Sequence, residues 1–154
     1  MKSTDLDFFV SLRNKCVAYL HDSRKFSLSD AKRWFKTTNP QYFVIEFEGS
    51  KVGYIRTSAW DLQNKNVYVG ADIEPKYRKK GFAFEALKLF IDFLLREKKF
   101  NKVSLEVLDF NTPAISLYKK LGFKKEGVRR HHVKKGNRYV DSLIMGFLRA
   151  DYLK

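Results

Sequence analysis

Cysteine, histidine and proline are all scarce in this sequence. Its 154 residues include one cysteine, three histidines and three prolines. A single cysteine excludes an internal disulfide, and we interpret Cys16 as a half-buried thiol rather than a nucleophile. His21, His131 and His132 lack the spacing of a metal-binding motif, and no cysteine pair or carboxylate cluster accompanies them. We therefore expect no metal site.

Long apolar runs are missing as well. No stretch approaches the roughly 20 apolar residues that cross a bilayer, and residues 1–7 are polar and acidic, unlike a secretory leader. With 44% hydrophobic and 16% aromatic residues, the chain has enough apolar material for a core. It has no linker rich in glycine, proline or serine. We expect one domain over residues 1–154, no membrane partner and a cytoplasmic location.

Acidic residues are few beside the basic ones: 17 Asp and Glu against 31 Lys and Arg, a net charge of +14. Three interpretations stay open, namely a nucleic-acid partner, an anionic small molecule, or a solvated basic surface. Most basic residues are scattered along the chain, so a solvated surface accounts for most of the charge, and nucleic acid is not the expected partner. One cluster, Lys76-Tyr77-Arg78-Lys79-Lys80, is concentrated between two predicted elements.

The hydrophobic pattern predicts the element order α-α-β-β-β-α-β-α-β-β. Helical spacing marks residues 5–12, behind possible caps at Ser3 and Thr4, and a helix through 83–94. Another helix follows a capping-box variant, Ser27-x-x-Asp30. The last is predicted to have Thr112 as its N-cap and Pro113 as its first residue, and to stop at Gly122. Alternating residues mark strands at 42–47, 52–59, 67–74, 103–108, 124–132 and 138–148. The unit 67–108 reads as a strand–helix–strand crossover, so its two strands should run parallel and lie adjacent or nearly so.

The segment Pro75–Ala83 joins a strand to the strongest predicted helix. A helix start presents free N–H groups and a partial positive charge, which together bind an anion such as a pyrophosphate. Small residues allow the anion to approach the backbone, and Gly81 and Ala83 meet that need. Arg78, Lys79 and Lys80 add positive charge. Neither a Walker loop nor a dinucleotide-binding glycine pattern is present.

Two motifs resemble those of the GNAT superfamily of N-acetyltransferases. Arg78-x-x-Gly81-x-Ala83 is similar to the R/Q-x-x-G-x-G/A signature, and residues 111–123 are similar to the N-x-x-A-x-x-L-Y-x-x-x-G-F signature. The resemblance covers about residues 42–152. Residues 137–145 resemble the last strand of the subgroup that acetylates ribosomal-protein N-termini, polyamines and amino sugars. Leu12-Arg13-Asn14 with Trp34-Phe35 resembles the opening of amino-sugar acetyltransferases.

The resemblance implies the fold and the cofactor site. The expected fold is a single α/β (α+β) domain with a mixed, mostly antiparallel sheet, a central splayed parallel strand pair and flanking helices. Acetyl-CoA is the implied cosubstrate, its pantetheine arm pairing with exposed backbone in the splay like an added strand. The residues implied to hold it are Ala71, Asp72, Ile73, Arg78, Lys79, Lys80, Gly81, Phe82, Ala83 and Asn111, the last of which also suits a helix entry.

The resemblance also implies the catalytic groups. Tyr118 fits the general acid that protonates the leaving thiolate. Glu106 is placed like the glutamate base of ribosomal-protein acetyltransferases, while Asp72, Glu46 and a water relay remain open as alternatives. The amine is expected to attack the thioester directly, without a covalent enzyme intermediate. We interpret His131 and His132 as exposed hairpin residues.

The acceptor is less constrained than the chemistry. We expect a small amine such as a nucleotide-linked amino sugar, because of the resemblance of the N-terminal segment to amino-sugar acetyltransferases. The basic charge also suits an anionic acceptor; a polyamine stays open, although a positive enzyme should repel polyamines and basic ribosomal proteins at long range. A protein N-terminal α-amine remains the alternative acceptor. A non-catalytic protein that binds coenzyme A or nucleic acid is the alternative from a different class, and a homodimer stays open.

Overall fold

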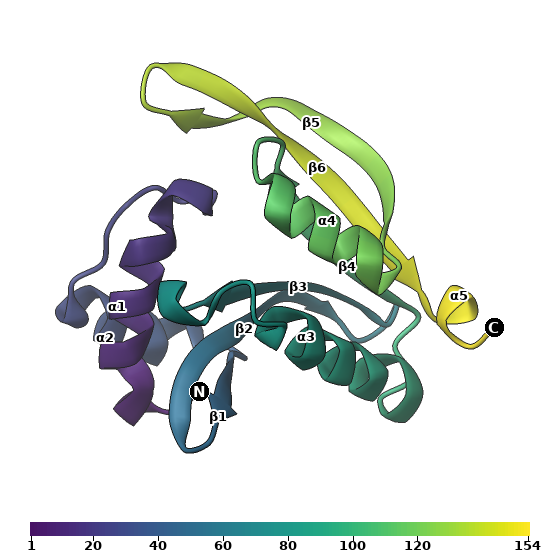
Figure 1. Cartoon of the computed structure of the whole chain (residues 1–154), viewed down its shortest axis with the longest axis horizontal. Coiled ribbons are helices and arrows are strands. Elements are labelled where there is room, and N and C mark those ends of the chain that lie inside the picture. The colour runs from purple at the N-terminus through teal and green to yellow at the C-terminus, as the bar shows by residue number, and fades with distance from the viewer.

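The computed structural model describes residues 1–154 and contains one six-stranded sheet in the order β1-β2-β3-β4-β6-β5 (Figure 1). All neighbouring strands are antiparallel except β3 and β4, which are parallel. The predicted mixed sheet with its central parallel pair is therefore confirmed. The strands are β1 (Phe43–Phe47), β2 (Ser50–Asp61), β3 (Asn66–Ile73), β4 (Lys102–Leu108), β5 (Lys124–Lys135) and β6 (Arg138–Leu148).

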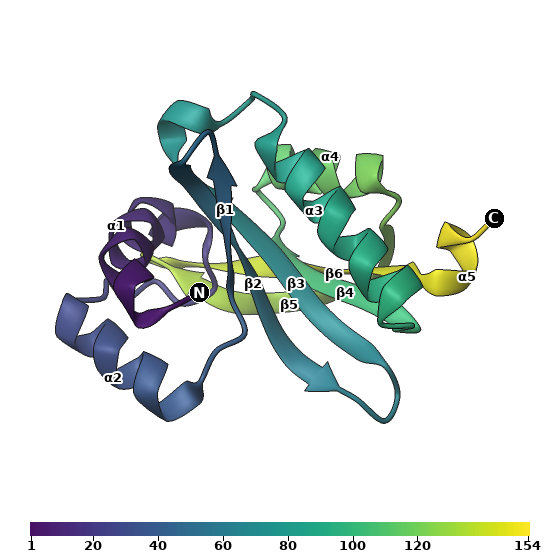
Figure 2. The same cartoon turned by 90° about the horizontal axis from the view of Figure 1, so that it is seen from below.

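Helices cover both faces of the first half of the sheet. The helices of the whole chain are α1 (Leu6–Cys16), α2 (Leu28–Thr38), α3 (Phe82–Asp92), α4 (Thr112–Leu121) and α5 (Arg149–Tyr152), of which the first three cover this half. Figure 2 shows α1 and α2 on one side of β1–β3 and α3 on the other. Adjacent residues of β2 follow this division: Tyr54 packs with the α1–α2 cluster, whereas Ile55 belongs to the main core with α3 and β4. Side chains alternate between the faces of a strand, so one strand supports two separate cores.

Local sequence signals set most helix ends. Ser27 and Asp30 form the predicted reciprocal cap at the start of α2. Gly122, at φ +105°, ends α4 as predicted, and a side chain there would meet the Phe147 ring 2.9 Å away. The cap of α4 was predicted at Thr112 but is Asn111, whose side chain accepts a hydrogen bond from the Ala114 backbone. Because the Asn111 side-chain oxygen accepts the hydrogen bond from the Ala114 N–H, Asn111 is the cap and Thr112 is the first residue of the helix.

Several element boundaries differ from those predicted, among them β2, which extends two residues further at each end. Helix α1 continues to Cys16 and is preceded by the 3-10 turn Ser3–Asp5, where Asp5, rather than Ser3 or Thr4, accepts from the Lys2 N–H. A π-helical turn, Phe93–Glu97, follows α3. Strand β5 runs on to Lys135, since a bulge between Arg129 and Val133 lets pairing with β6 resume after the hydrophobic alternation is lost.

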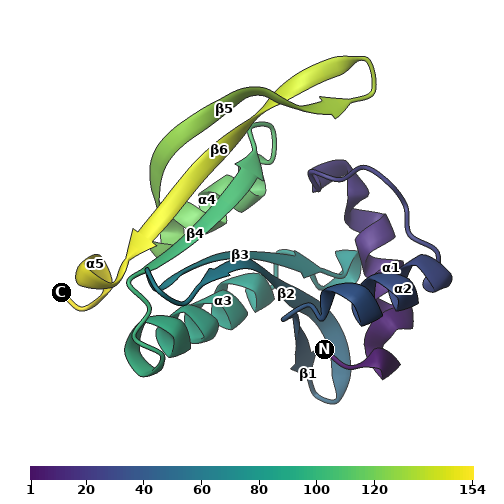
Figure 3. The same cartoon turned by 180° about the vertical axis from the view of Figure 1, so that it is seen from behind.

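The sheet divides between its two central strands. Strands β3 and β4 are paired at only three positions, Asn66–Lys102, Val67–Val103 and Tyr68–Ser104. Beyond them β3 stays paired with β2 as far as Ile73, and β4 stays paired with β6 as far as Leu108. Figure 3 shows the resulting V-shaped arrangement of the two halves. The backbone of residues 69–73 therefore has no strand partner on the β4 side.

No helix in the structure has both the length and the apolar character needed to pass through a membrane.

Candidate active site

A cavity of about 460 Å³ lies where β3 and β4 diverge. It is bounded by the end of α1, the end of β3, the loop before α3, the first turn of α3 and the first half of α4. Nine of the ten residues that the resemblance assigned to the cofactor line it: Ala71, Asp72, Ile73, Arg78, Lys79, Gly81, Phe82, Ala83 and Asn111. The structure therefore brings two distant sequence motifs to one cavity, which we call the cofactor cavity.

The loop before α3 has the backbone of an anion site. Gly81 is the N-cap residue at φ +88°, a conformation that favours glycine, and it provides no side chain to cap the helix. The first N–H groups of α3 thus keep no side-chain cap at the edge of the cofactor cavity. A Cβ atom at Gly81 would meet no protein atom within 4 Å, so the space beside it is free for a ligand.

The basic residues of this loop have different roles. The Arg78 guanidinium donates to the Ile73 carbonyl (3.0 Å) and to the Cys16 sulfur (3.2 Å), so it holds the loop against β3 and α1 while keeping its charge in the cavity wall. Lys79 also lines the cavity. Lys80 does not; its ammonium group lies 5.7 Å from the centre of the Tyr77 ring.

Cys16 and Tyr19 line the cofactor cavity, although no sequence signal connected them with it. They lie at and just after the end of α1, which reaches the site only through tertiary packing. Cys16 is fully buried rather than half-buried. Burial is the main reason why its pKa is raised to about 11, which agrees with the interpretation that it is not a nucleophile.

Tyr118 lies on α4 with its side chain buried against the Phe123 ring. Burial is the main cause that raises the pKa of its phenol; the Asp72 carboxylate acts in the same direction, and Arg56 acts against it. The phenol therefore stays protonated at neutral pH, as a general acid must. Tyr118 itself is not part of the cavity wall, but Ala114, one turn earlier on α4, is.

A second cavity, of about 230 Å³, lies beside β3 and is lined by residues that include His21, Arg56, Gly70 and Glu106. We call it the acceptor-side cavity. An ion pair of 2.6 Å between Arg56 Nε and Asp72 Oδ2 links the two cavities, because Arg56 lines the second and Asp72 the first. A Cβ atom at Gly70 would lie 2.9 Å from the Arg56 guanidinium, so glycine leaves room for this pair.

Glu106 belongs to the acceptor-side cavity and is surrounded by basic groups. One carboxylate oxygen lies 3.1 Å from Arg129, and the other lies 3.6 Å from His21 Nε2 and 4.0 Å from His132 Nε2. His132 is an exposed hairpin residue, as expected, and its Nε2 atom also comes within 4.0 Å of this carboxylate. His131 is exposed and stacks on Tyr139, as the hairpin interpretation expected.

The two other carboxylates considered as bases are placed differently. Asp72 is held in its ion pair with Arg56, and Glu46 is exposed on the outer strand β1, outside both cavities. Sequence reasoning did not identify His21 or Arg56, since neither lies in a recognisable motif and both reach the site only through the tertiary fold. No group of three or more histidine, cysteine or carboxylate side chains is placed to bind a metal ion.

The family is established by comparison with known proteins. The model of the acetyltransferase (GNAT) family matches residues 6–123. The chain therefore belongs to the GNAT family of N-acetyltransferases, acyltransferases whose cosubstrate is acetyl-CoA.

Individual relatives agree with this assignment. The chain is 35% identical over 155 residues to the uncharacterized prophage-derived N-acetyltransferase YokL of Bacillus subtilis, covering 96% of this chain and 86% of that protein. It is 32% identical over 104 residues to a putative ribosomal protein bS18 alanine N-acetyltransferase of the same species, covering 68% of this chain and 66% of that protein. The crystal structure of spermidine N-acetyltransferase from Vibrio cholerae with CoA and spermine has the same fold, with a TM-score of 0.91, 22% identity, and coverage of 100% and 95%.

Proposed function

We propose that this chain acetylates a primary amine that enters through the acceptor-side cavity and meets acetyl-CoA bound in the cofactor cavity. The observation that carries the proposal is the splay itself. The sheet opens after three residue pairs and leaves one cavity for each substrate, and the charges of the ion pair that links them act on the buried Tyr118 phenol. Two substrates held at adjoining sites need only be aligned for direct attack.

In this proposal acetyl-CoA fills the place of a missing strand. The backbone of Ala71–Ile73, which has no partner on the β4 side, pairs with the pantetheine amides, and the uncapped start of α3 receives the pyrophosphate. Asn111 already caps α4 through its side-chain oxygen, so its side-chain N–H₂ group is the part available to the pantetheine arm.

Glu106 and Tyr118 are the two catalytic groups of this proposal, and each acts in one proton transfer. The ammonium form of the acceptor loses one proton on the Glu106 side, and the free amine attacks the thioester carbonyl. When the tetrahedral intermediate collapses, the C–S bond breaks and the Tyr118 phenol protonates the departing thiolate. The phenolate regains its proton from the nitrogen that becomes the amide, so that one proton is released to solvent in each turnover.

The acceptor we favour is a small primary amine attached to an anionic group, such as a nucleotide-linked amino sugar. Arg56 and Arg129 lie beside the acceptor-side cavity, and the chain carries a net charge of +14. None of the relatives reported above is named for an amino sugar; their names point to a ribosomal-protein alanine and to spermidine. A protein N-terminus is therefore the second candidate acceptor and spermidine the third. A cytoplasmic location remains a prediction from the sequence.

A thiol-release assay tests the proposal. The protein is mixed with acetyl-CoA and, separately, with a nucleotide-linked amino sugar, a peptide with an N-terminal alanine, and spermidine, and free coenzyme A is followed with a thiol reagent. Amine-dependent release is expected, fastest with the anionic amine. If coenzyme A binds and no amine on the panel releases thiol, a non-catalytic binding protein becomes the better description.

A further inference from the structure

His21 belongs to a loop between α1 and α2, but its side chain reaches the central strands. Its Nε2 atom lies 2.7 Å from the fully buried Ser142 hydroxyl on β6 and 3.6 Å from Glu106 on β4. Its ring centre is 6.0 Å from that of His132 on β5. His21 therefore meets three strands that are distant from it in sequence, and it lines the acceptor-side cavity together with Glu106.

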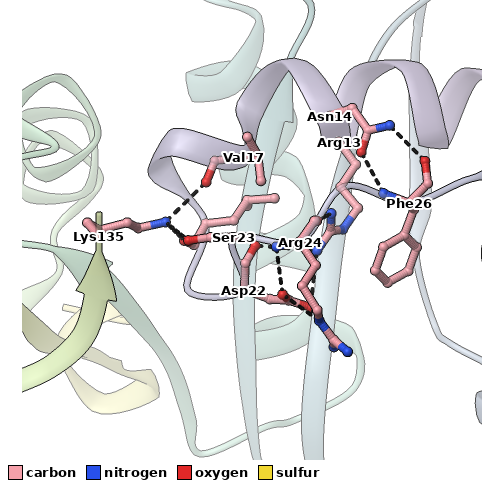
Figure 4. A network of polar contacts seen from close by, with 9 residues as sticks. Arg13, Asn14, Val17, Asp22, Ser23, Arg24, Phe26 and Lys135 are labelled. Carbon is pink, nitrogen blue, oxygen red and sulfur yellow. Dashed lines mark hydrogen bonds and ion pairs between the residues drawn. The ribbon is translucent and has the colours of Figure 1, made fainter. Parts of the chain in front are cut away.

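Polar contacts from Arg13 and Asn14 on α1 hold the part of the loop from Asp22 to Phe26 (Figure 4). The buried Arg13 pairs with the Asp22 carboxylate at 3.2 Å and donates to the Arg24 carbonyl. The Asn14 side chain bonds to both the N–H and the carbonyl of Phe26, at 2.9 and 2.8 Å. These contacts fix the part of the loop that follows His21.

Lys135, near the tip of the β5–β6 hairpin, anchors the loop from the opposite side. Its ammonium group donates to the carbonyls of Val17 and Leu20 and to the Ser23 hydroxyl, at 2.7 Å for the last. All three acceptors lie within four residues of His21 (Figure 4). The loop therefore presents His21 to Glu106 in a defined position.

The surroundings of His21 keep its imidazole neutral. Burial is the main cause that lowers its pKa, and Arg56 on β2 and His132 and Lys135 on β5 act in the same direction. The Glu106 carboxylate on β4 opposes them, itself facing Arg129. A neutral imidazole beside a carboxylate can take up a proton, and the resulting imidazolium is stabilised by that carboxylate.

We propose that His21 is a catalytic base of the acceptor site, which accepts the proton that the acceptor ammonium loses and works as a pair with Glu106. This inference rests on the proposed function. The N–H bond of the ammonium breaks, its electron pair stays on nitrogen for the attack, and the proton moves to the imidazole. The His21 side chain is 33% exposed, so the imidazolium can return the proton to solvent before the next turnover.

A kinetic comparison of His21→Gln with His131→Gln tests this role. Gln retains a hydrogen-bonding group for Ser142 but cannot take up the proton, whereas His131 is an exposed histidine stacked on Tyr139. With the most active amine of the panel, we expect kcat/KM of His21→Gln to fall by about tenfold or more at pH 7. The deficit should shrink as the pH approaches the pKa of the amine, because the amine then arrives deprotonated. His131→Gln should match the wild type.

A loss that is the same at every pH would mark a merely structural role and overturn the proposal, as would full activity of His21→Gln. Coenzyme A affinity should be unchanged in both variants. An inactive wild-type protein would instead overturn the proposed function and this role with it, so the two failures are distinguishable.

A proton NMR titration of His21 tests the pairing without turnover. In Glu106→Gln the carboxylate that raises the His21 pKa is removed, so the His21 resonance should titrate at lower pH than in the wild-type protein. An identical His21 titration in both proteins would contradict the pair.

Discussion

Tyr118 is the residue on which the proposed chemistry depends most directly. Its phenol is buried and its pKa is raised, so it keeps its proton at neutral pH and is in the acid form when the thiolate departs. Tyr118→Phe should lower kcat by about 10²- to 10⁴-fold with little change in the KM for acetyl-CoA, because only the proton is lost. Thiol release measures both parameters. Tyr139→Phe, at an exposed hairpin position, is the control, and full turnover by Tyr118→Phe would remove the residue from the acid role.

Gly81 offers a second test at the scale of one residue. Gly81 and Gly136 both have positive φ, +88° and +60°, and neither has protein atoms near its missing side chain. Replacing either by Ala should cost about 1 kcal/mol of stability, since both positions strain an L residue. Only Gly81→Ala should also weaken coenzyme A binding, measured by calorimetry, because its methyl group enters the space beside the start of α3. Equal affinities in the two variants would contradict a pyrophosphate site there.

Lys135 connects two elements that are far apart in the sequence, the β5–β6 hairpin and the loop after α1. Lys135→Met keeps most of the side-chain volume but leaves the Val17 and Leu20 carbonyls without this donor, which should cost about 1–3 kcal/mol in urea unfolding. Acceptor-dependent kcat/KM should fall severalfold while coenzyme A affinity holds. Lys134→Met, one residue away and exposed, should leave both quantities unchanged.

Hydrogen exchange gives the structural readout of the same pair of variants. Amides of residues 17–26 should exchange faster in Lys135→Met and not in Lys134→Met. Unaltered exchange in Lys135→Met would show that Arg13 and Asn14 hold the loop without the hairpin.

At the scale of elements, the sequence predicted what local rules determine. Alternation identified the strands, the Ser27 cap and Gly122 fixed two helix ends, and the two motifs lie on the loop and helix expected of them. Two features were not predicted, because they depend on competing or non-local contacts. Asn111 rather than Thr112 supplies the α4 cap, and the bulge in β5 interrupts its alternation before pairing resumes.

The candidate site was predictable only where it is contiguous in sequence. Residues at the end of β3, in the loop before α3 and in the α4 motif were found, and nine of them line one cavity. His21, Arg56 and Cys16 were missed, because each reaches the site by the packing of α1, its following loop or β2 against the splayed strands. Tertiary contacts of this kind leave no spacing signal in a single sequence.

At the scale of the whole molecule, the net charge of +14 should act on acceptors before they bind. Raising the salt concentration from about 0.05 to 0.5 M shortens the screening length severalfold. The KM of an anionic acceptor should therefore rise with salt, whereas that of spermidine should fall, because repulsion is being screened. Initial rates at subsaturating amine measure the effect. A KM for the anionic acceptor that is independent of salt would mean that the charge is only a solvated surface.

The edge strand β5 also affects whether the sheet can pair with a second copy of the chain. Exposed Lys124, Lys125, Arg129, Arg130 and Lys134 follow one another along this unpaired edge, and the bulge twists its far half. Two copies approaching edge to edge would bring these like charges together over a distorted backbone, which opposes the continuous pairing that begins aggregation. The positive charge along this strand therefore also opposes pairing of the long sheet edge with a second copy of the chain during folding and storage.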